Sequence, residues 1–316
     1  MATYDSLVSR TDAAGLIPVE YASGVIDSMT YSSVALGTFR RVTMPRAQTE
    51  VPVLSVLPSA YWVGESDTGL KQTSEQNWEN VTLYARELAV IIPIPEAVVA
   101  DSTIDLWAEI TPRIAEAFGQ KIDAATLFGT NAPTAWPDDI VTDAISADNE
   151  YIIGTVSGDL LDVDISNAMQ KVEDDGFDVN VAYARRNIRG RLRSLRATDD
   201  KPIFAQALTT DGIDAIYGND LRYVSNGAWD DTYAMIVGDR NAAILGVRQD
   251  INYRIFTEGV ISDGSGDVQL NLMQQDAIAL RATMRVAFAV ANPVNRVQET
   301  ASSRFPFAVL TEDPGS

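Results

Sequence analysis

Two apolar runs decide the fold: TEVPVLSVL at residues 49–57 and WENVTLYARELAVIIPI at residues 78–94. In the second run, apolar side chains recur at alternate positions from Val81 to Ile91, a pattern typical of a β-strand. The first run is apolar on both faces, which indicates a strand covered on both sides. We predict that the two runs pair as antiparallel strands.

The connection between these runs, residues 58–77, is polar and contains Gly64 and Gly69. Nearly twenty residues without a pattern is long for a loop inside a compact domain. An isolated two-stranded ribbon is also only marginally stable in water. Two interpretations stay open: a disordered surface loop, or an extended arm that a neighbouring subunit completes.

A long amphipathic helix is predicted over residues 102–128, because apolar side chains recur there at steps of three and four. Such a helix would be about 40 Å long. Asp101 or Ser102 is the expected cap at its start, and Gly129 suits its end. Pro112 should kink the helix, or restart it with Thr111 as the cap.

The strongest strand pattern lies near the end of the chain, where apolar residues alternate without a slip over residues 278–290. We expect this strand to pack on the long helix, so that their domain is discontinuous. The remaining expected elements are helices at 18–36, 165–172 and 184–196, strands at 39–44, 179–183, 221–224, 233–237 and 251–256, and a loop-like break at 131–149. The middle region therefore reads as mixed α/β.

The amino-acid composition excludes several common kinds of enzyme active site. The chain of 316 residues has no cysteine and no histidine, which excludes thiolate nucleophiles, imidazole bases and the usual zinc ligand sets. A net charge of −20 repels phosphate backbones. No apolar run reaches the roughly 18 residues that a membrane helix needs, and the N-terminus lacks a signal-peptide pattern. We expect a cytosolic product with no cofactor and no metal.

Two clusters of acidic residues are candidate sites. Glu173, Asp174 and Asp175 could be paired catalytic carboxylates, but a solvated helix end is the better interpretation. DGSGD at 263–267 resembles part of a calcium loop; it lacks the further acids of such a loop, so a β-turn is predicted. No phosphate-binding glycine motif occurs.

The densest basic cluster is on residues 184–196, for which a helix is predicted. Arg185, Arg189, Arg193 and Arg196 should share one face of this helix. They either form ion pairs within their own acidic domain or contact a neighbouring subunit, and both alternatives stay open. Guanidinium groups suit bidentate carboxylate pairing in either case.

The order of these features resembles the HK97-like major capsid proteins of tailed bacteriophages. The segments that carry the resemblance are WVGE at 62–65, AVIIPIPE at 89–96, IAEAF at 114–118, LFG at 127–129, LRSLR at 192–196, DDKPIF at 199–204, and DAIALRATMRVAFAVANP at 276–293. Together they span about residues 17–297.

The resemblance implies an α+β fold with four parts: an N-terminal arm with a first helix at 1–44, an extended hairpin loop at 45–85, a peripheral domain at 86–130 and 269–316, and an axial α/β domain at 131–268. The subunit would form pentamers and hexamers of an icosahedral head around double-stranded DNA, bound without sequence specificity. The expected subunit-interface residues are Trp62, Glu65, Lys71, Trp78, Arg185, Arg189 and Arg193.

Further partners follow from the same resemblance. Only a short segment precedes Pro18, which implies a separate scaffolding protein; a portal protein and a decoration protein are also expected, and no membrane. The virion capsid would be assembled in the host cytoplasm. Some members of the family join an arm lysine to a neighbour's asparagine, and Lys71 with Asn292 or Asn295 would be the candidates here.

The sequence leaves open two functions other than that of a phage capsid protein. An encapsulin-type shell shares the fold but encloses protein cargo. A carboxylate-based hydrolase would need two carboxylates about 5–10 Å apart in one cleft.

Overall fold

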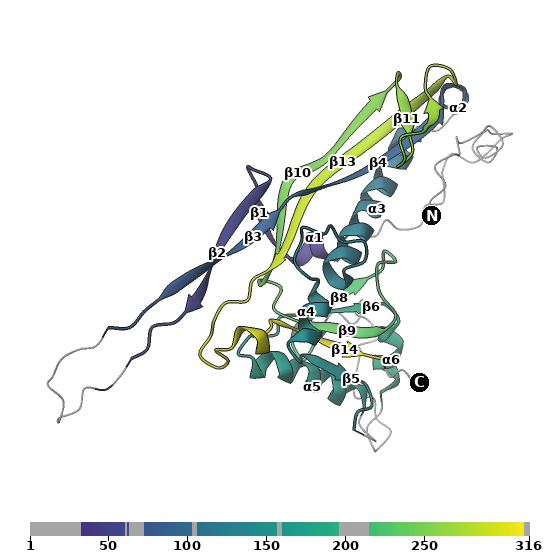
Figure 1. Cartoon of the computed structure of the whole chain (residues 1–316). Coiled ribbons are helices and arrows are strands. Elements are labelled where there is room, and N and C mark those ends of the chain that lie inside the picture. Colours follow the sequence, from purple (N-terminus) through teal and green to yellow (C-terminus); the bar gives the residue numbers. More distant parts are fainter. Residues whose placement is uncertain are drawn as a thin grey trace. The chain divides into compact units, whose positions relative to one another are not determined.

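The structure is a computed structural model that describes residues 33–60, 62, 73–102, 106–156, 160–195 and 215–312 (Figure 1). The chain divides into two compact units. Of the described residues, unit 1 contains those of Arg86–Phe118 and Arg248–Val286, and unit 2 contains those of Ser32–Ala85, Gly119–Val247 and Ala287–Ser316. The four-part division expected from the sequence is a different partition and stays a prediction.

Unit 1 is built on an antiparallel pair of strands. Strand β4 (Arg86–Pro95) pairs with β13 (Ala277–Val290) over ten residues, from Pro95 opposite Ala277 to Arg86 opposite Val286. Ile94 of β4 is buried with Val98 of α2 (Glu96–Asp101) and Leu106 of α3 (Leu106–Phe128). The long helix therefore packs on the strand that pairs with β13, as its apolar stripe requires.

The other elements of unit 1 are part of β10 (Ala243–Phe256) and a hairpin of β11 (Val260–Ser262) and β12 (Val268–Asn271). Between β11 and β12, Asp263 Oδ1 accepts from the backbone N–H groups of Ser265 and Asp267, each at 2.9 Å. The predicted turn at DGSGD is thus confirmed, with the aspartate holding the turn.

The second apolar run is not one strand, contrary to the prediction. It forms β3 (Asn77–Tyr84), which pairs with β2 (Gln48–Val56), and then β4, which leaves β2 and pairs with β13. The break falls at Ala85. The sequence explains it, because the covered positions are odd-numbered in β3, with Leu83 fully buried, and even-numbered toward the end of β4, with Ile94 buried. When the covered side chains change from odd-numbered to even-numbered positions, they project from the opposite face of the chain, and one continuous strand cannot keep both sets covered.

The start of the long helix differs from the prediction in one respect: Asp101 ends a separate short helix, α2, and Ser102 is the C-terminal cap of that helix. Residues 103–105 lie outside the described part of the chain, so the capping of α3 by Asp101 or Ser102 stays a prediction. Pro112 lies inside α3, and the Thr111 hydroxyl donates to the Trp107 carbonyl of the same helix at 2.7 Å. The helix does not restart there. Gly129 follows its last residue with φ of +63°, which confirms the predicted glycine stop.

Unit 2 contains a six-stranded mixed sheet with the order β5-β14-β9-β6-β8-β7 (Figure 1). Its strands are β5 (Glu150–Ile152), β14 (Phe307–Thr311), β9 (Tyr233–Gly238), β6 (Val181–Arg185), β8 (Asn219–Val224) and β7 (Ala215–Ile216). Helices α5 (Leu161–Asp174) and α6 (Ile188–Ser194) supply Ile165, Val172 and Leu192 to its core. The expected alternation of short helices and strands is confirmed.

Three predicted boundaries in unit 2 need correction. The expected break at 131–149 contains α4 (Ile140–Ser146), whose start is capped by Asp139 accepting from Thr142 N at 2.9 Å. The predicted helix at 184–196 begins only at Ile188, because residues 184–185 complete β6. Strand β10 begins at Ala243 rather than 251, and its first four residues are buried. A continuous buried run lacks the alternation that marks a half-buried strand.

The segment that leads to the hairpin is held by one buried carboxylate. Helix α1 (Val34–Thr38) precedes β1 (Arg40–Thr43), which runs parallel to residues 244–247 of β10. Asp123 of α3 is fully buried, and it accepts from Ser33 Oγ at 2.6 Å and from the backbone N–H groups of Val34 and Ala35 at 3.0 and 2.9 Å. Its fourth donor is Asn226 Nδ2 at 2.6 Å.

Asp123 therefore caps a helix that is remote in the sequence. Burial raises the pKa of its carboxyl group, and the hydrogen bonds from Ser33, Ala35, Val34 and Asn226 lower it in opposition. The carboxylate satisfies the N–H groups that α1 leaves without an internal partner. The predicted helix at 18–36 lies mostly outside the described residues, and only its last part overlaps α1.

We predict that Asp123→Ala lowers the free energy of unfolding of the unassembled chain by about 3 kcal/mol, because four buried donors lose their acceptor. Denaturant unfolding of purified subunits measures the change. The control is Asp174→Ala, since Asp174 is an exposed carboxylate near the end of α5. A loss for Asp123→Ala no larger than that of the control would contradict the assignment.

Candidate interaction surfaces

Strands β2 and β3 form a sheet of their own, with no third strand among the residues that the structure describes (Figure 1). Their pairing runs from Gln48 opposite Tyr84 to Leu54 opposite Trp78, and an irregularity follows before Val56. Residues opposite each other in an antiparallel pair project from the same face. The register therefore defines two faces of this hairpin.

One face of the hairpin is covered within unit 2. Leu83 is buried there, and Val51 and Val81 pack beside it against a cluster that includes Met44 and Ile244. On the other face, Trp78 and Tyr84 keep 65% and 38% of their surface exposed. The uncovered face, which we call the aromatic face, consists of Gln48, Glu50, Pro52, Leu54, Trp78, Asn80, Thr82 and Tyr84. It carries large apolar side chains into solvent, which is typical of a binding surface.

The base of the hairpin is attached firmly to its unit. Ala85 N donates to the Ala47 carbonyl at 2.8 Å, and Trp136 Nε1 donates to the Tyr84 carbonyl at 3.0 Å. Beyond the hairpin, Trp62 is 97% exposed. The predicted interface residues Glu65 and Lys71 lie outside the described residues.

The arginine cluster is not the single helical face that the sequence predicted. Arg185 is the last residue of β6, where it forms an ion pair with Asp231, and only Arg189 and Arg193 belong to α6. Arg193 Nε donates to the Arg189 carbonyl at 3.2 Å, and the Arg189 guanidinium lies 4.2 Å from the centre of the Tyr223 ring. Arg196 lies outside the described residues. The side chains of Arg185 and Arg193 therefore come from different elements.

The two candidate cross-linking asparagines already have partners. Asn292 Nδ2 donates to the carbonyls of Ala301 and Arg304 at 3.2 and 2.8 Å. Asn295 Nδ2 donates to the Asp175 carbonyl at 2.6 Å. Each amide nitrogen thus stabilises the chain's own backbone.

Two groups of exposed apolar residues were not found from the sequence. In unit 2 they surround the start of α5, and in unit 1 they surround the β11–β12 hairpin. The first group is Ile152, Val156, Leu160, Val163 and Tyr217, and the second is Ile255, Val260, Val268 and Met273. Tyr217 joins the first group through its hydroxyl, which donates to the Asp162 carbonyl at 3.1 Å. Several of these residues lie at the ends of elements, such as Ile152 of β5 and Val260 of β11, where too few residues remain for a periodicity to reveal them.

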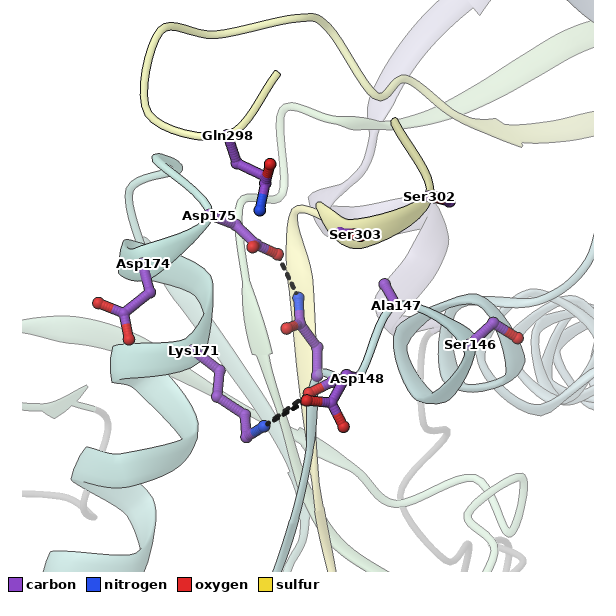
Figure 2. Close-up of a pocket in the computed structure, with 10 residues that line it drawn as sticks. Ser146, Ala147, Asp148, Lys171, Asp174, Asp175, Gln298, Ser302 and Ser303 are labelled. Atoms are coloured by element: carbon purple, nitrogen blue, oxygen red, sulfur yellow. Dashed lines mark hydrogen bonds and ion pairs between the residues drawn. The ribbon is translucent and has the colours of Figure 1, made fainter. Parts of the chain in front are cut away.

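A polar pocket of about 410 Å³ lies between the ends of α4 and α5 and residues 298–303 (Figure 2). Its carboxylates have partners: Asp148 Oδ2 is 3.7 Å from Lys171 Nζ, and Asp175 Oδ2 accepts from Asn149 Nδ2 at 2.7 Å. Asp175 is only 7% exposed, which corrects the prediction of a solvated helix end for this residue, whereas Glu173 and Asp174 are exposed as predicted. The pocket holds structural carboxylates rather than a free catalytic pair.

No group of three or more acidic, histidine or cysteine side chains among the described residues could hold a metal ion. Within the same part of the chain, no helix is both long enough and apolar enough to cross a membrane.

Comparison with known proteins gives consistent matches along the chain. Residues 13–295 match the model of the phage capsid family. The major capsid protein of Staphylococcus phage 80alpha is 26% identical over 292 residues, which cover 91% of this chain and 86% of that protein.

Solved structures agree. A chain from Microbacterium phage Oxtober96 is 38% identical with a TM-score of 0.83, and one from Mycobacterium phage Cain is 30% identical with a TM-score of 0.82; each comparison covers 98% of this chain and 100% of the other. The capsid of a native GTA particle shares the fold at 16% identity, with a TM-score of 0.67 over 97% of this chain and 99% of that chain.

The matches confirm the HK97-like α+β fold and favour neither an encapsulin-type shell nor a hydrolase. They extend over the hairpin, the long helix and both units, which are the parts that carry the resemblance in the sequence. The chain belongs to the phage capsid family, and it is a major capsid protein of a phage head.

Proposed function

We propose that this capsid protein forms pentamers and hexamers of a closed icosahedral head, in which the aromatic face of the β2–β3 hairpin binds a neighbouring subunit. The observation that carries the proposal is the exposure of Trp78 on a hairpin to which no other strand of the described chain pairs. A two-stranded ribbon is marginal alone, and a neighbour that covers its open face would stabilise it.

The energetic scale supports this role. Burying one large apolar side chain contributes about 2 kcal/mol, and tryptophan and tyrosine are enriched among the residues that dominate protein interfaces. Each subunit would donate one hairpin and receive one, so the contact repeats around every ring. A modest contribution per contact then accumulates over the whole shell.

Arg185, Arg189 and Arg193 form a second proposed contact, together with Trp62, Glu65 and Lys71 of the arm. In a chain with net charge −20, neighbouring subunits repel one another at long range. A local group of arginines would offset this repulsion where an acidic surface of the neighbour meets it. Arginine suits such pairing because its planar group can bind a carboxylate through two hydrogen bonds.

The place of assembly, the partner proteins and the domain boundaries are proposed on the same basis. The virion capsid would be assembled in the host cytoplasm with a separate scaffolding protein and a portal protein, and a decoration protein could bind its surface. Packaged double-stranded DNA would touch the shell without sequence-specific contacts, because the chain is strongly acidic. In terms of this fold, we assign residues 45–85 to the extended loop, 86–130 and 269–316 to the peripheral domain, and 131–268 to the axial domain.

We predict that Trp78→Ala reduces particle formation at least tenfold at a fixed subunit concentration, while the unfolding free energy of the free subunit changes by less than about 0.5 kcal/mol. Negative-stain microscopy and light scattering measure the particles. Asn77→Ala is the matched control, because Asn77 is exposed on the same strand but projects from the other face. Normal particle yield from Trp78→Ala would refute the role of the aromatic face.

Charge reversal tests the arginine contact. The double variant Arg189→Glu with Arg193→Glu should fold, since the cation–π contact of the half-buried Arg189 with Tyr223 contributes at most about 2 kcal/mol, yet it should fail to assemble. The control is Arg189→Lys with Arg193→Lys, which keeps the charge. If the charge-reversed variant forms particles of normal number and size, the arginines act only through contacts within their own subunit, and the proposed contact with a neighbour is rejected.

The covalent cross-link can be tested on a denaturing gel of mature particles. We expect monomer-sized bands, because the amide nitrogens of Asn292 and Asn295 already donate to backbone carbonyls. A ladder of larger bands that disappears in Lys71→Arg would instead establish a bond from Lys71.

A further inference from the structure

The segment between β13 and β14, residues 292–304, folds around one buried arginine. Arg304 is only 4% exposed, and its guanidinium donates to four backbone carbonyls of this segment. The acceptors are Asn292 (3.2 Å), Pro293 (3.2 Å), Gln298 (3.4 Å) and Glu299 (2.6 Å). A planar group with five N–H donors suits such a cage, and a lysine cannot reproduce it.

Side chains of the same segment close it further. Asn292 Nδ2 binds the carbonyls of Ala301 and Arg304, and Asn295 Oδ1 accepts from the backbone N–H groups of Val297 and Gln298 at 3.0 and 2.9 Å. Only Ala301–Ser303 forms a regular element, one turn of 3₁₀ helix. The segment thus has a defined shape without the backbone ladder of a helix or sheet. We call it the Arg304 loop.

On one side the Arg304 loop is fixed to the six-stranded sheet and α5. Asn295 Nδ2 donates to the Asp175 carbonyl at 2.6 Å, and Asp175 Oδ2 accepts from Phe305 N at 2.9 Å, directly before β14. The same carboxylate oxygen binds Asn149 (Figure 2). The loop also packs closely on Gly176, where an added Cβ would lie 2.8 Å from the Val297 Cβ.

On the other side the loop reaches the hairpin well beyond its base. Val294 N donates to the Leu54 carbonyl at 3.0 Å, and Arg296 Nη2 donates to the Pro58 carbonyl at 2.6 Å. The base contacts at Ala47 and Tyr84 hold the hairpin at one end only. A second attachment at Leu54 and Pro58 restricts rotation about that end.

We propose that Arg304 is a positioning residue for the hairpin: its loop sets the direction in which β2 and β3 project from the rest of unit 2. The importance of that direction for assembly rests on the proposed function, in which the hairpin meets a neighbouring subunit. The nine residues of β2 span about 30 Å. A rotation of about 10° at the base would therefore move the far end by about 5 Å, enough to miss its contact.

The direction can be measured directly, because the chain has no native cysteine. Spin labels at Asn77→Cys on the hairpin and Glu173→Cys on α5 report one distance within unit 2, and both positions are exposed. Pulsed electron spin resonance is done on unassembled full-length subunits diluted with unlabelled chain. We expect one narrow distance distribution in the parent protein.

Two variants then test the loop. Arg304→Met removes the cage at similar side-chain volume and should broaden the distance distribution at least twofold. Arg296→Ala removes the bond to Pro58 alone and should broaden it to a smaller extent. Arg222→Met is the control, because Arg222 pairs with Asp220 on β8, away from the loop, and should leave the width unchanged.

The outcomes separate the two proposals. Unchanged width in Arg304→Met and Arg296→Ala overturns the positioning role. Should Arg304→Met fail to fold by circular dichroism, Arg296→Ala decides alone, and an unchanged width there is sufficient to reject it. If the distribution broadens but particles still form with normal yield and diameter, the positioning role stands and the hairpin contact of the proposed function fails.

Discussion

The carboxylate of Asp123 is the constraint on which unit 2 depends. It removes a charged group from water, and it is tolerable only because four donors surround it, three of them at Ser33, Val34 and Ala35. These donors lie at the start of α1, immediately before β1 and the hairpin. One interaction therefore connects the most buried part of α3 with the chain that leads to the most exposed element, and this fixes where β1 begins its pairing with β10.

The Arg304 loop depends on the same kind of interaction, a buried charged group surrounded by hydrogen-bond partners. Arg304 and Asp123 are both buried charged groups. Backbone carbonyls satisfy Arg304, and two backbone N–H groups with two neutral side chains satisfy Asp123, so neither depends on an opposite charge. Buried charged side chains of this kind favour one backbone conformation, because any other conformation leaves the buried charge without hydrogen-bond partners. They are placed where irregular chain must hold a fixed shape without a regular ladder. The helices and sheets of unit 2 supply the stability, and these two residues supply the geometry of the connections.

Strong periodicity made much of the fold predictable. Strand β13 was expected at 278–290 and occupies Ala277–Val290, and Trp78 was correctly placed on the paired strands. The parity change at Ala85 was present in the sequence and was overlooked. By contrast, the partners of Asp123 lie 88 to 103 residues away, and the carbonyls that bind Arg304 belong to residues of no particular type. Neither network has a local pattern. The exposed groups near α5 and β11 depend on tertiary placement alone.

The position of Pro52 within β2 has a consequence for how the protein avoids aggregation. A hairpin with two open edges can template further strands, which is the usual route from native sheets to uncontrolled polymers. Pro52 has no N–H to offer, and by alternation its backbone faces the same outer edge as Leu54, whose carbonyl is taken by Val294. Part of that edge of β2 is thus closed to strand addition. In a capsid protein, whose subunits must associate, Pro52 therefore hinders association by incorrect strand addition at this edge.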